Sequence, residues 1–156
     1  GSEVEQTVHK IGIGFCFAPV FHSSMKHAVA ARKELGVPTV FNILGPLANP
    51  AKPIAAAIGV ARSELLPLMA QVLLDQGKEG FIFRGDDGLD EVSLSTTTTV
   101  IQISKGKLKQ EIFNPAELGI ATAPITALAG GDAKYNAQMT SQIFAGKSGP
   151  MRDAVT

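Results

Sequence analysis

Residues 55–84 read AAAIGVARSELLPLMAQVLLDQGKEGFIFR, and this stretch indicates the fold class. It opens with a short apolar run at 55–60 and closes with a second one at 80–84, each of the length typical of a buried strand. Between them apolar residues recur at helical spacing, as Leu65, Leu68, Met69, Val72 and Leu73. A strand, a helix and a second strand in this order predict an α/β protein with a parallel portion in its sheet.

The limits of this helix can also be predicted. Ser63 is of a type that caps helix N-termini, and Gly77 supplies a stop. Pro67 is tolerated because it falls within about the first turn, where a helix does not need every backbone N–H group.

An antiparallel hairpin is predicted after the second strand. The β-branched run at 95–103 is typical of a strand, residues 105–107 form a turn, and residues 108–113 can return alongside. Further on, Asp132 ends a glycine turn and is expected to cap a helix over residues 133–144.

Before residue 55 we predict one more strand and one more helix. The apolar run at 11–18 reads as a buried strand closed by Pro19, and residues 22–35 read as a helix. Cys16 lies in the apolar run, so we interpret it as a small buried side chain and not as a nucleophile. It is the single cysteine of the chain, which excludes an intrachain disulfide and favours a reducing compartment.

The composition is that of a globular protein, with 45% apolar and 18% charged residues among 156. Fourteen basic and fourteen acidic residues cancel, so no overall field attracts nucleic acid or an anionic membrane. No apolar stretch reaches the roughly 18 residues needed to cross a bilayer. We therefore expect neither nucleic acid nor a membrane as a partner.

The ends of the sequence suggest a piece of a longer protein. Residues 1–2 look like the remnant of an expression tag, and residues 3–156 read as part of a single α/β domain. Residues 152–156 look like a helix that begins and is cut off.

Arg32 is the first candidate functional residue. It occupies an inward position on an otherwise apolar helical stripe, where an unpaired charge is costly. Either its stem packs while the guanidinium reaches solvent, or the guanidinium binds a carboxylate or phosphate in a pocket. His22 lies on broadly the same side of the predicted helix, although a histidine near a helix start is more often a cap or a surface residue.

Two further motifs stand out. Residues 42–50, NILGPLANP, predict a tight, irregular path, which is either a plain ordered loop or one that lines a site. Residues 85–91, GDDGLDE, directly follow a predicted strand, where α/β proteins place ligands. Their acidic residues form either a solvated turn or a Mg²⁺ site, for which adjacent Asp90 and Glu91 offer hard oxygen ligands.

Together these motifs resemble the anthranilate phosphoribosyltransferase family. The resemblance extends in order over nearly the whole chain and rests mainly on GIGFCFAP at 12–19, TVFNILGPL at 39–47, GDDGLDE at 85–91 and residues 149–155. It implies the nucleoside phosphorylase/phosphoribosyltransferase type of α/β domain, with a central sheet flanked by helices and an added antiparallel hairpin.

The resemblance also implies an activity and roles for residues. Anthranilate would react with phosphoribosyl pyrophosphate in tryptophan biosynthesis, in a cytoplasmic enzyme that is a homodimer. Arg32 matches the arginine that faces the anthranilate carboxylate, and His22, Gly45 and Pro46 match residues of the same pocket. Asp90 and Glu91 match the acidic pair that holds Mg²⁺ on the pyrophosphate.

The chain departs from the family in one respect, because the glycine-rich phosphate loop and the N-terminal helical domain are not in this sequence. We therefore expect the 156-residue chain alone to be inactive. Two alternatives remain: a pyrimidine nucleoside phosphorylase, which the acidic pair disfavours, and a non-catalytic binding module on the same scaffold.

Overall fold

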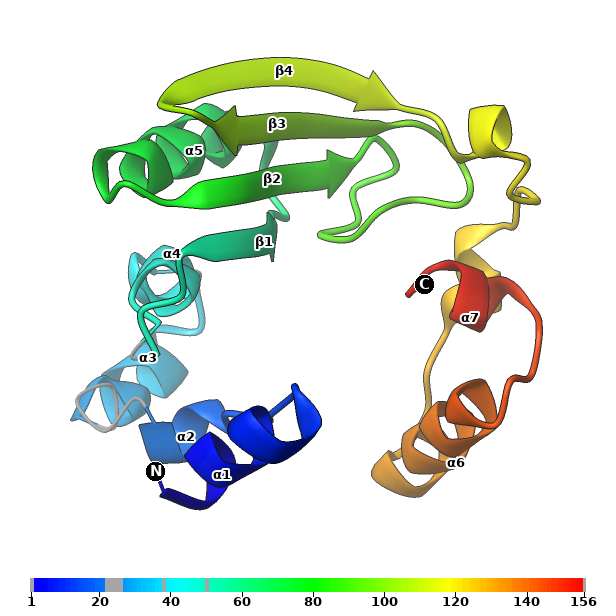
Figure 1. Cartoon of the computed structure of the whole chain (residues 1–156), viewed down its shortest axis with the longest axis horizontal. Helices are drawn as coiled ribbons and strands as arrows, with labels where there is room; N and C mark the ends of the chain where they lie inside the picture. Colours follow the sequence, from blue (N-terminus) through cyan, green and yellow to red (C-terminus); the bar gives the residue numbers. More distant parts are fainter. Residues whose placement is uncertain (1, 22–26, 38, 50, 156) are drawn as a thin grey trace. The chain divides into compact units, whose positions relative to one another are not determined.

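The structure is a computed structural model that describes residues 2–21, 27–37, 39–49 and 51–155. It comprises two compact units, Gly1–Lys52 and Pro53–Thr156. The first unit is helical and the second holds a four-stranded sheet with helices, which confirms the predicted α/β class (Figure 1).

Four short α-helices lie in the described part of the first unit. They are α1 (Ser2–Ile11), α2 (Ala18–Phe21), α3 (Val29–Leu35) and α4 (Phe41–Leu47). Helix α3 ends at Gly36, whose φ of 62° is left-handed, so the predicted stop is confirmed. Residues 22–26 of the predicted helix lie outside the described residues, and His22 is among them. Among the described residues of this unit, Leu47 is the only apolar one that is buried.

The prediction of a buried strand at 11–18 was wrong. Residues 13–17 have no regular structure, and the chain enters α2 at Ala18. Phe15 is 79% exposed, and Cys16 is exposed although we predicted it to be buried. An apolar run shows only a tendency to be buried, whereas a strand also needs a neighbouring strand to complete its hydrogen bonds. In the described residues every paired strand belongs to the second unit.

The irregular loop predicted at 42–50 is in its first part a helix. Helix α4 runs from Phe41 to Leu47 and includes Pro46. A proline inside a helix lacks the N–H group that would bond to the carbonyl four residues earlier, and its ring crowds that carbonyl, so it favours a helix end. Pro46 falls in the last turn, and the helix closes when the Ala48 N–H donates to the Leu44 carbonyl at 2.9 Å.

The predicted strand–helix–strand order of the second unit is confirmed. Strand β1 (Ala55–Gly59) pairs in parallel with β2 (Glu79–Gly85), and α5 (Leu66–Asp75) lies between them in sequence. A 3-10 turn, η2 (Ser63–Leu65), precedes α5, and Ser63 makes no capping hydrogen bond, so that detail was wrong. Helix α5 turns one face to the core through Leu66, Met69, Ala70 and Leu73.

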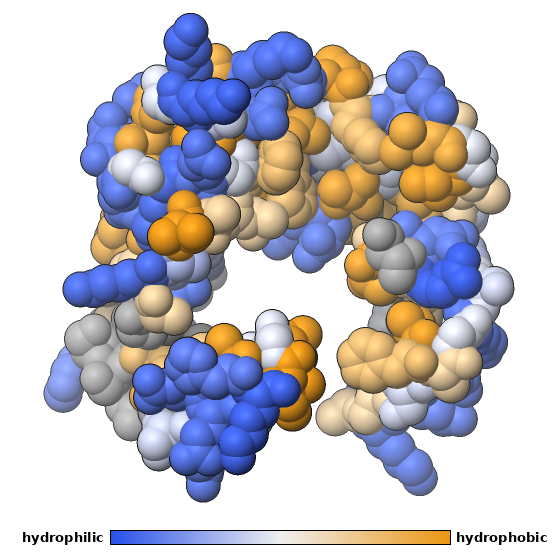
Figure 2. Space-filling view, in the orientation of Figure 1, coloured by the Kyte–Doolittle hydropathy of each residue, from blue (hydrophilic) through white to orange (hydrophobic). Residues whose placement is uncertain are grey.

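The hairpin is also confirmed. Strands β3 (Thr98–Ser104) and β4 (Lys107–Phe113) are antiparallel and extend the sheet to the order β1-β2-β3-β4. The buried side chains Ile82, Ile101 and Ile103 form the core with the inner face of α5. Strand β4 is exposed along most of its length, and Figure 2 shows hydrophilic side chains over its beginning, at the top left of the view.

The remaining elements follow the sheet in sequence. They are η3 (Pro115–Leu118), η4 (Ile125–Leu128), α6 (Ala133–Phe144) and α7 (Pro150–Asp153). The predicted cap of α6 is present, because an Asp132 carboxylate oxygen accepts a hydrogen bond from the Tyr135 N–H at 2.8 Å. No helix in the described ranges is both long enough and apolar enough to span a bilayer.

Candidate functional site: an arginine pocket and an acidic loop

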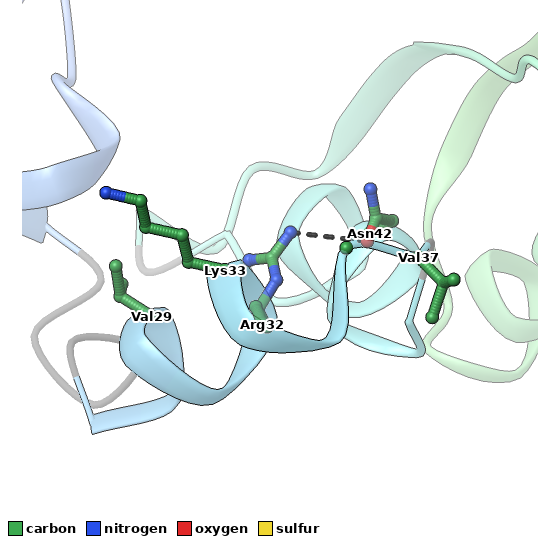
Figure 3. Close-up of a pocket in the computed structure, with 6 residues that line it drawn as sticks. Val29, Arg32, Lys33, Val37 and Asn42 are labelled. Atoms are coloured by element: carbon green, nitrogen blue, oxygen red, sulfur yellow. Dashed lines mark hydrogen bonds between the residues drawn. The ribbon is translucent and has the colours of Figure 1, made fainter.

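Arg32 lies on α3 and points toward Asn42 at the start of α4 (Figure 3). Its guanidinium has two partners there. Its Nη2 donates a hydrogen bond to Oδ1 of Asn42 at 3.2 Å, and its Cζ lies 5.9 Å from the centre of the Phe41 ring. Asn42 Oδ1 also accepts the Thr39 N–H at 3.1 Å, which orients the amide group. The guanidinium is therefore held against the first residues of α4, and its remaining N–H groups can donate to a ligand.

A cavity of about 350 Å³ opens beside this guanidinium. Arg32, Lys33 and Asn42 supply its polar lining, and none of the described residues that line it is acidic. Two cations and an amide without an opposing carboxylate suit an anionic ligand. Gly45 and Pro46 lie on α4 with Asn42 but do not belong to this lining, and His22 is outside the described residues.

The acidic motif forms the start of the loop that connects β2 with β3. Its first two carboxylates are already engaged by hydroxyl groups. Asp86 accepts hydrogen bonds from Thr97 and Thr99, and Asp87 accepts them from Ser93 and Ser95. These two aspartates thus hold the loop to itself and to the beginning of β3.

The next two carboxylates are free. Within the described part of the chain, neither Asp90 nor Glu91 has a side-chain hydrogen bond or an ion pair. Burial of part of its side chain, together with the negative charge of Asp90, raises the pKa of Glu91 above its ordinary value. Two adjacent carboxylates that repel each other and lack partners are suited to a shared cation.

These residues fit Mg²⁺ in donor type and number. Mg²⁺ prefers oxygen ligands and usually keeps several waters, so one or two carboxylates together with substrate phosphate are sufficient. A cage of three or more metal-binding side chains is not found among the described residues, so protein ligands alone would not complete a site. Glu91 is also one of the residues that line a larger, mainly apolar cavity of about 660 Å³, together with residues of α6 and α7.

Sequence reasoning found the acidic pair but missed the residues that hold its loop. Ser93, Ser95, Thr97 and Thr99 alternate along the chain and meet Asp86 and Asp87, whereas we interpreted the threonines only as strand formers. The alternation of hydroxyl residues soon after two aspartates was the available signal. Gly59 was missed as well, and the backbone carbonyl oxygen of Asp90 lies directly over it.

Known proteins resemble this chain over nearly its whole length. An anthranilate phosphoribosyltransferase of Rhodococcus jostii is 50% identical over 153 residues, which are 98% of this chain and 42% of that protein. The Saccharomyces cerevisiae enzyme in complex with 4-fluoroanthranilate matches with a TM-score of 0.89 and 36% identity over 99% of this chain and 46% of that one. Its complex with PRPP and Mg matches with a TM-score of 0.88 and 34% identity, over 99% and 45%.

These matches confirm the predicted resemblance to anthranilate phosphoribosyltransferases, although the chain spans less than half the length of these relatives. The family model of the glycosyl transferase family, a/b domain, matches residues 1–156. The chain therefore belongs to the glycosyl transferase family and carries its a/b domain.

Proposed function

We propose that this chain is part of an anthranilate phosphoribosyltransferase, which transfers the 5-phosphoribosyl group from phosphoribosyl pyrophosphate to the amine of anthranilate and releases pyrophosphate. The observation that carries the proposal is the free Asp90–Glu91 pair in the loop that follows β2. The relatives of this name, one of them bound to PRPP and Mg and one to 4-fluoroanthranilate, support it.

In this proposal Arg32 binds the carboxylate of anthranilate. Its planar guanidinium can donate two parallel hydrogen bonds to a carboxylate, and Asn42 and Phe41 already hold it in place. His22, Gly45 and Pro46 are proposed to line the same pocket, on the basis of the family resemblance. This assigns recognition of the acceptor to the first unit.

Asp90 and Glu91 are proposed to hold Mg²⁺ beside the pyrophosphate group. When bound, the cation supplies positive charge that stabilises the negative charge developing on the departing pyrophosphate. The two aspartates before them are occupied by hydroxyl groups, so the loop presents a pair of carboxylates and not four.

The reaction is a displacement at C1 of the ribose, in which the anthranilate nitrogen forms the new bond as the bond to pyrophosphate oxygen breaks. The nitrogen loses a proton afterwards. An amine conjugated to an aromatic ring is a weak nucleophile, so holding both substrates in line contributes much of the rate enhancement. The proposed mechanism needs no nucleophile from the protein.

The test is the fall in anthranilate fluorescence when the full-length natural protein is mixed with phosphoribosyl pyrophosphate and Mg²⁺. We expect a fall that a chelator abolishes and that Asp90→Asn and Glu91→Gln strongly slow. Asp75→Asn is the matched control, because it removes one exposed carboxylate whose only hydrogen bond among the described residues is from Gln71 on α5. No fall with the wild-type protein contradicts the proposal, and turnover of a pyrimidine nucleoside with phosphate would replace it.

We also propose, from the family resemblance, that the full-length natural protein is a cytoplasmic homodimer. The single, exposed cysteine fits a reducing compartment. Light scattering on the purified full-length protein measures its mass directly, and a monomer at micromolar concentration contradicts the dimer.

A further inference from the structure

The loop between β2 and β3 is anchored on both sides of the acidic pair. Before the pair in sequence, Asp87 Oδ1 accepts a hydrogen bond from the Leu89 N–H at 3.2 Å, and the Leu89 carbonyl accepts one from the Gly85 N–H at 2.9 Å. After the pair in sequence, Asp87 Oδ2 accepts hydrogen bonds from the hydroxyl groups of Ser93 at 2.6 Å and Ser95 at 2.5 Å. A single carboxylate therefore joins the residue before Asp90 to the turn that follows Glu91.

Ser93 is the buried centre of this arrangement. Its relative exposure is 0%, and its Oγ accepts the N–H groups of Ser95 at 2.9 Å and Thr96 at 3.1 Å while donating to Asp87. Its own N–H donates to Thr98 Oγ1 at 2.9 Å, at the first residue of β3. A buried hydroxyl with all its bonding capacity used fixes the backbone around it.

The ionised form of Asp87 is favoured by the same contacts. Partial burial opposes ionisation, but hydrogen bonds from Ser93, Ser95 and the Leu89 N–H outweigh it and lower the pKa of Asp87. As a carboxylate it can only accept hydrogen bonds, which is what three donors around it require.

We infer that Asp87 and Ser93 are positioning residues for the Asp90–Glu91 pair: they hold the loop so that the two free carboxylates bind a divalent cation together, without touching the cation themselves. This inference rests on the proposed function. The four acidic residues of the motif then have two separate roles. Asp86 and Asp87 anchor the loop through hydrogen bonds, and Asp90 and Glu91 bind the cation.

A positioning role and a purely electrostatic one give different results with two variants. Asp87→Asn removes a negative charge near the pair and also replaces an acceptor oxygen with a donor nitrogen. Ser93→Ala leaves every charge in place and removes only the hydroxyl group. An electrostatic role predicts that Asp87→Asn alone weakens cation binding, whereas positioning predicts that both variants do.

The experiment is a titration of the full-length natural protein with Mn²⁺ in the presence of inorganic pyrophosphate, followed by electron paramagnetic resonance. We expect both variants to bind Mn²⁺ about tenfold or more weakly, the usual effect of residues that orient metal ligands. Ser141→Ala is the matched hydroxyl control, since in the described part of the chain that hydroxyl makes one hydrogen bond, to the Ala137 carbonyl within α6. A general folding defect would lower the number of sites and leave the affinity of the folded molecules unchanged.

Hydrogen exchange at the amides of residues 88–96 is the second readout and requires no metal. We expect faster exchange there in Asp87→Asn and Ser93→Ala, with the β3–β4 hairpin unchanged. Wild-type Mn²⁺ affinity in Ser93→Ala, with or without a loss in Asp87→Asn, overturns the inference while the proposed function stands. Unchanged hydrogen exchange in both variants does the same. If Asp90→Asn also leaves Mn²⁺ binding unchanged, the metal site itself is refuted. The positioning inference and the proposed function then fail together.

Discussion

Arg32 provides the most direct test of acceptor recognition, because a second cation lies beside it in the same cavity. Arg32→Ala removes the guanidinium that Asn42 orients, whereas Lys33→Ala removes a charge that has no hydrogen-bond partner among the described residues. A charge-assisted hydrogen bond contributes about 1.5–3 kcal/mol, so we expect the Michaelis constant for anthranilate to rise roughly tenfold or more in Arg32→Ala. Lys33→Ala should raise it less, because an ammonium group is a point charge and lacks the paired donors of a guanidinium. Steady-state kinetics of the full-length protein measures both, and an unchanged constant in Arg32→Ala refutes the assignment.

Gly59 is required because the acidic loop passes directly over it. A Cβ atom at this position would lie 1.6 Å from the Asp90 carbonyl oxygen, a backbone atom that cannot rotate away. We expect Gly59→Ala to displace the loop, to destabilise the protein by about 1–3 kcal/mol as overpacking does, and to weaken Mn²⁺ binding. Ala57→Ser is the control, since it adds one atom to an exposed side chain of the same strand. Denaturant unfolding and the Mn²⁺ titration would show the effect, and a fully tolerated alanine contradicts the close approach.

Asp87 should make the stability of the protein depend on acidity. Its pKa is lowered in the folded chain, so its contribution is complete above the ordinary value of 3.8 and is lost as the pH falls through the lower folded value. We expect the wild-type protein to unfold at a higher temperature than Asp87→Asn at pH 7, with the difference shrinking below about pH 4. Thermal unfolding of both proteins from pH 7 to pH 3 tests the sign, and a difference that grows on acidification contradicts it.

At the level of elements, the β3–β4 hairpin depends on two residues with left-handed backbone conformation. Lys105 has φ 50° and Gly106 has φ 72°, a pattern in which asparagine and glycine are the favoured pair. We expect Gly106→Ala to destabilise the protein by about 1–2 kcal/mol and Lys105→Asn to stabilise it slightly. Neither residue is near the acidic pair in sequence, so Mn²⁺ affinity should not change. Urea unfolding of the two variants should give shifts of opposite sign.

The elements that sequence predicted correctly are those governed by local chemistry. The hairpin follows from its turn residues, and α6 follows from the cap at Asp132 and begins and ends where we expected. The strand predicted at 11–18 failed because pairing depends on a partner elsewhere in the chain. Helix α4 was not predicted, because the Gly-Pro and Asn-Pro pairs favour an irregular path, whereas the chain is helical up to Leu47, one residue after Pro46.

The candidate site also contains features that the sequence predicts and features that it does not. Its chemistry and its place after a strand made the acidic pair a candidate, and the family resemblance assigned it to Mg²⁺, which stays a prediction. Among the described residues, the two side chains have no hydrogen bond or ion pair. The loop anchors could not be predicted, since the bond between Ser93 and Asp87 and the approach of Asp90 to Gly59 exist only once the sheet has formed. From its spacing alone Arg32 allows two interpretations, and the family resemblance assigns it to the anthranilate pocket; this assignment stays a prediction.

At the scale of the whole molecule, the two units differ strongly in burial. The second unit has a core of apolar side chains from the sheet and α5, with Leu73 and Ile82 both fully buried. In the described part of the first unit Leu47 alone is buried, and Phe15 and Ile13 are more than 70% exposed. Burying one leucine contributes about 1.5–3 kcal/mol, which offsets the ordering of only one or two residues of backbone. The arginine pocket therefore lies in the part of the chain with less intrinsic stability.

This imbalance leads to a prediction for the 156-residue chain by itself. We expect its amides in β2 and β3 to be protected from hydrogen exchange and those in α3 and α4 to exchange rapidly, because few buried side chains hold these short helices. Frequent opening of α3 would break the contact between Arg32 and Asn42, so we expect no turnover of anthranilate by this chain. The full-length natural protein is the comparison, and there we expect α3 to be protected and the fluorescence of anthranilate to fall. Turnover by the 156-residue chain, or strong protection of α3 within it, would show that the first unit is ordered without further contacts.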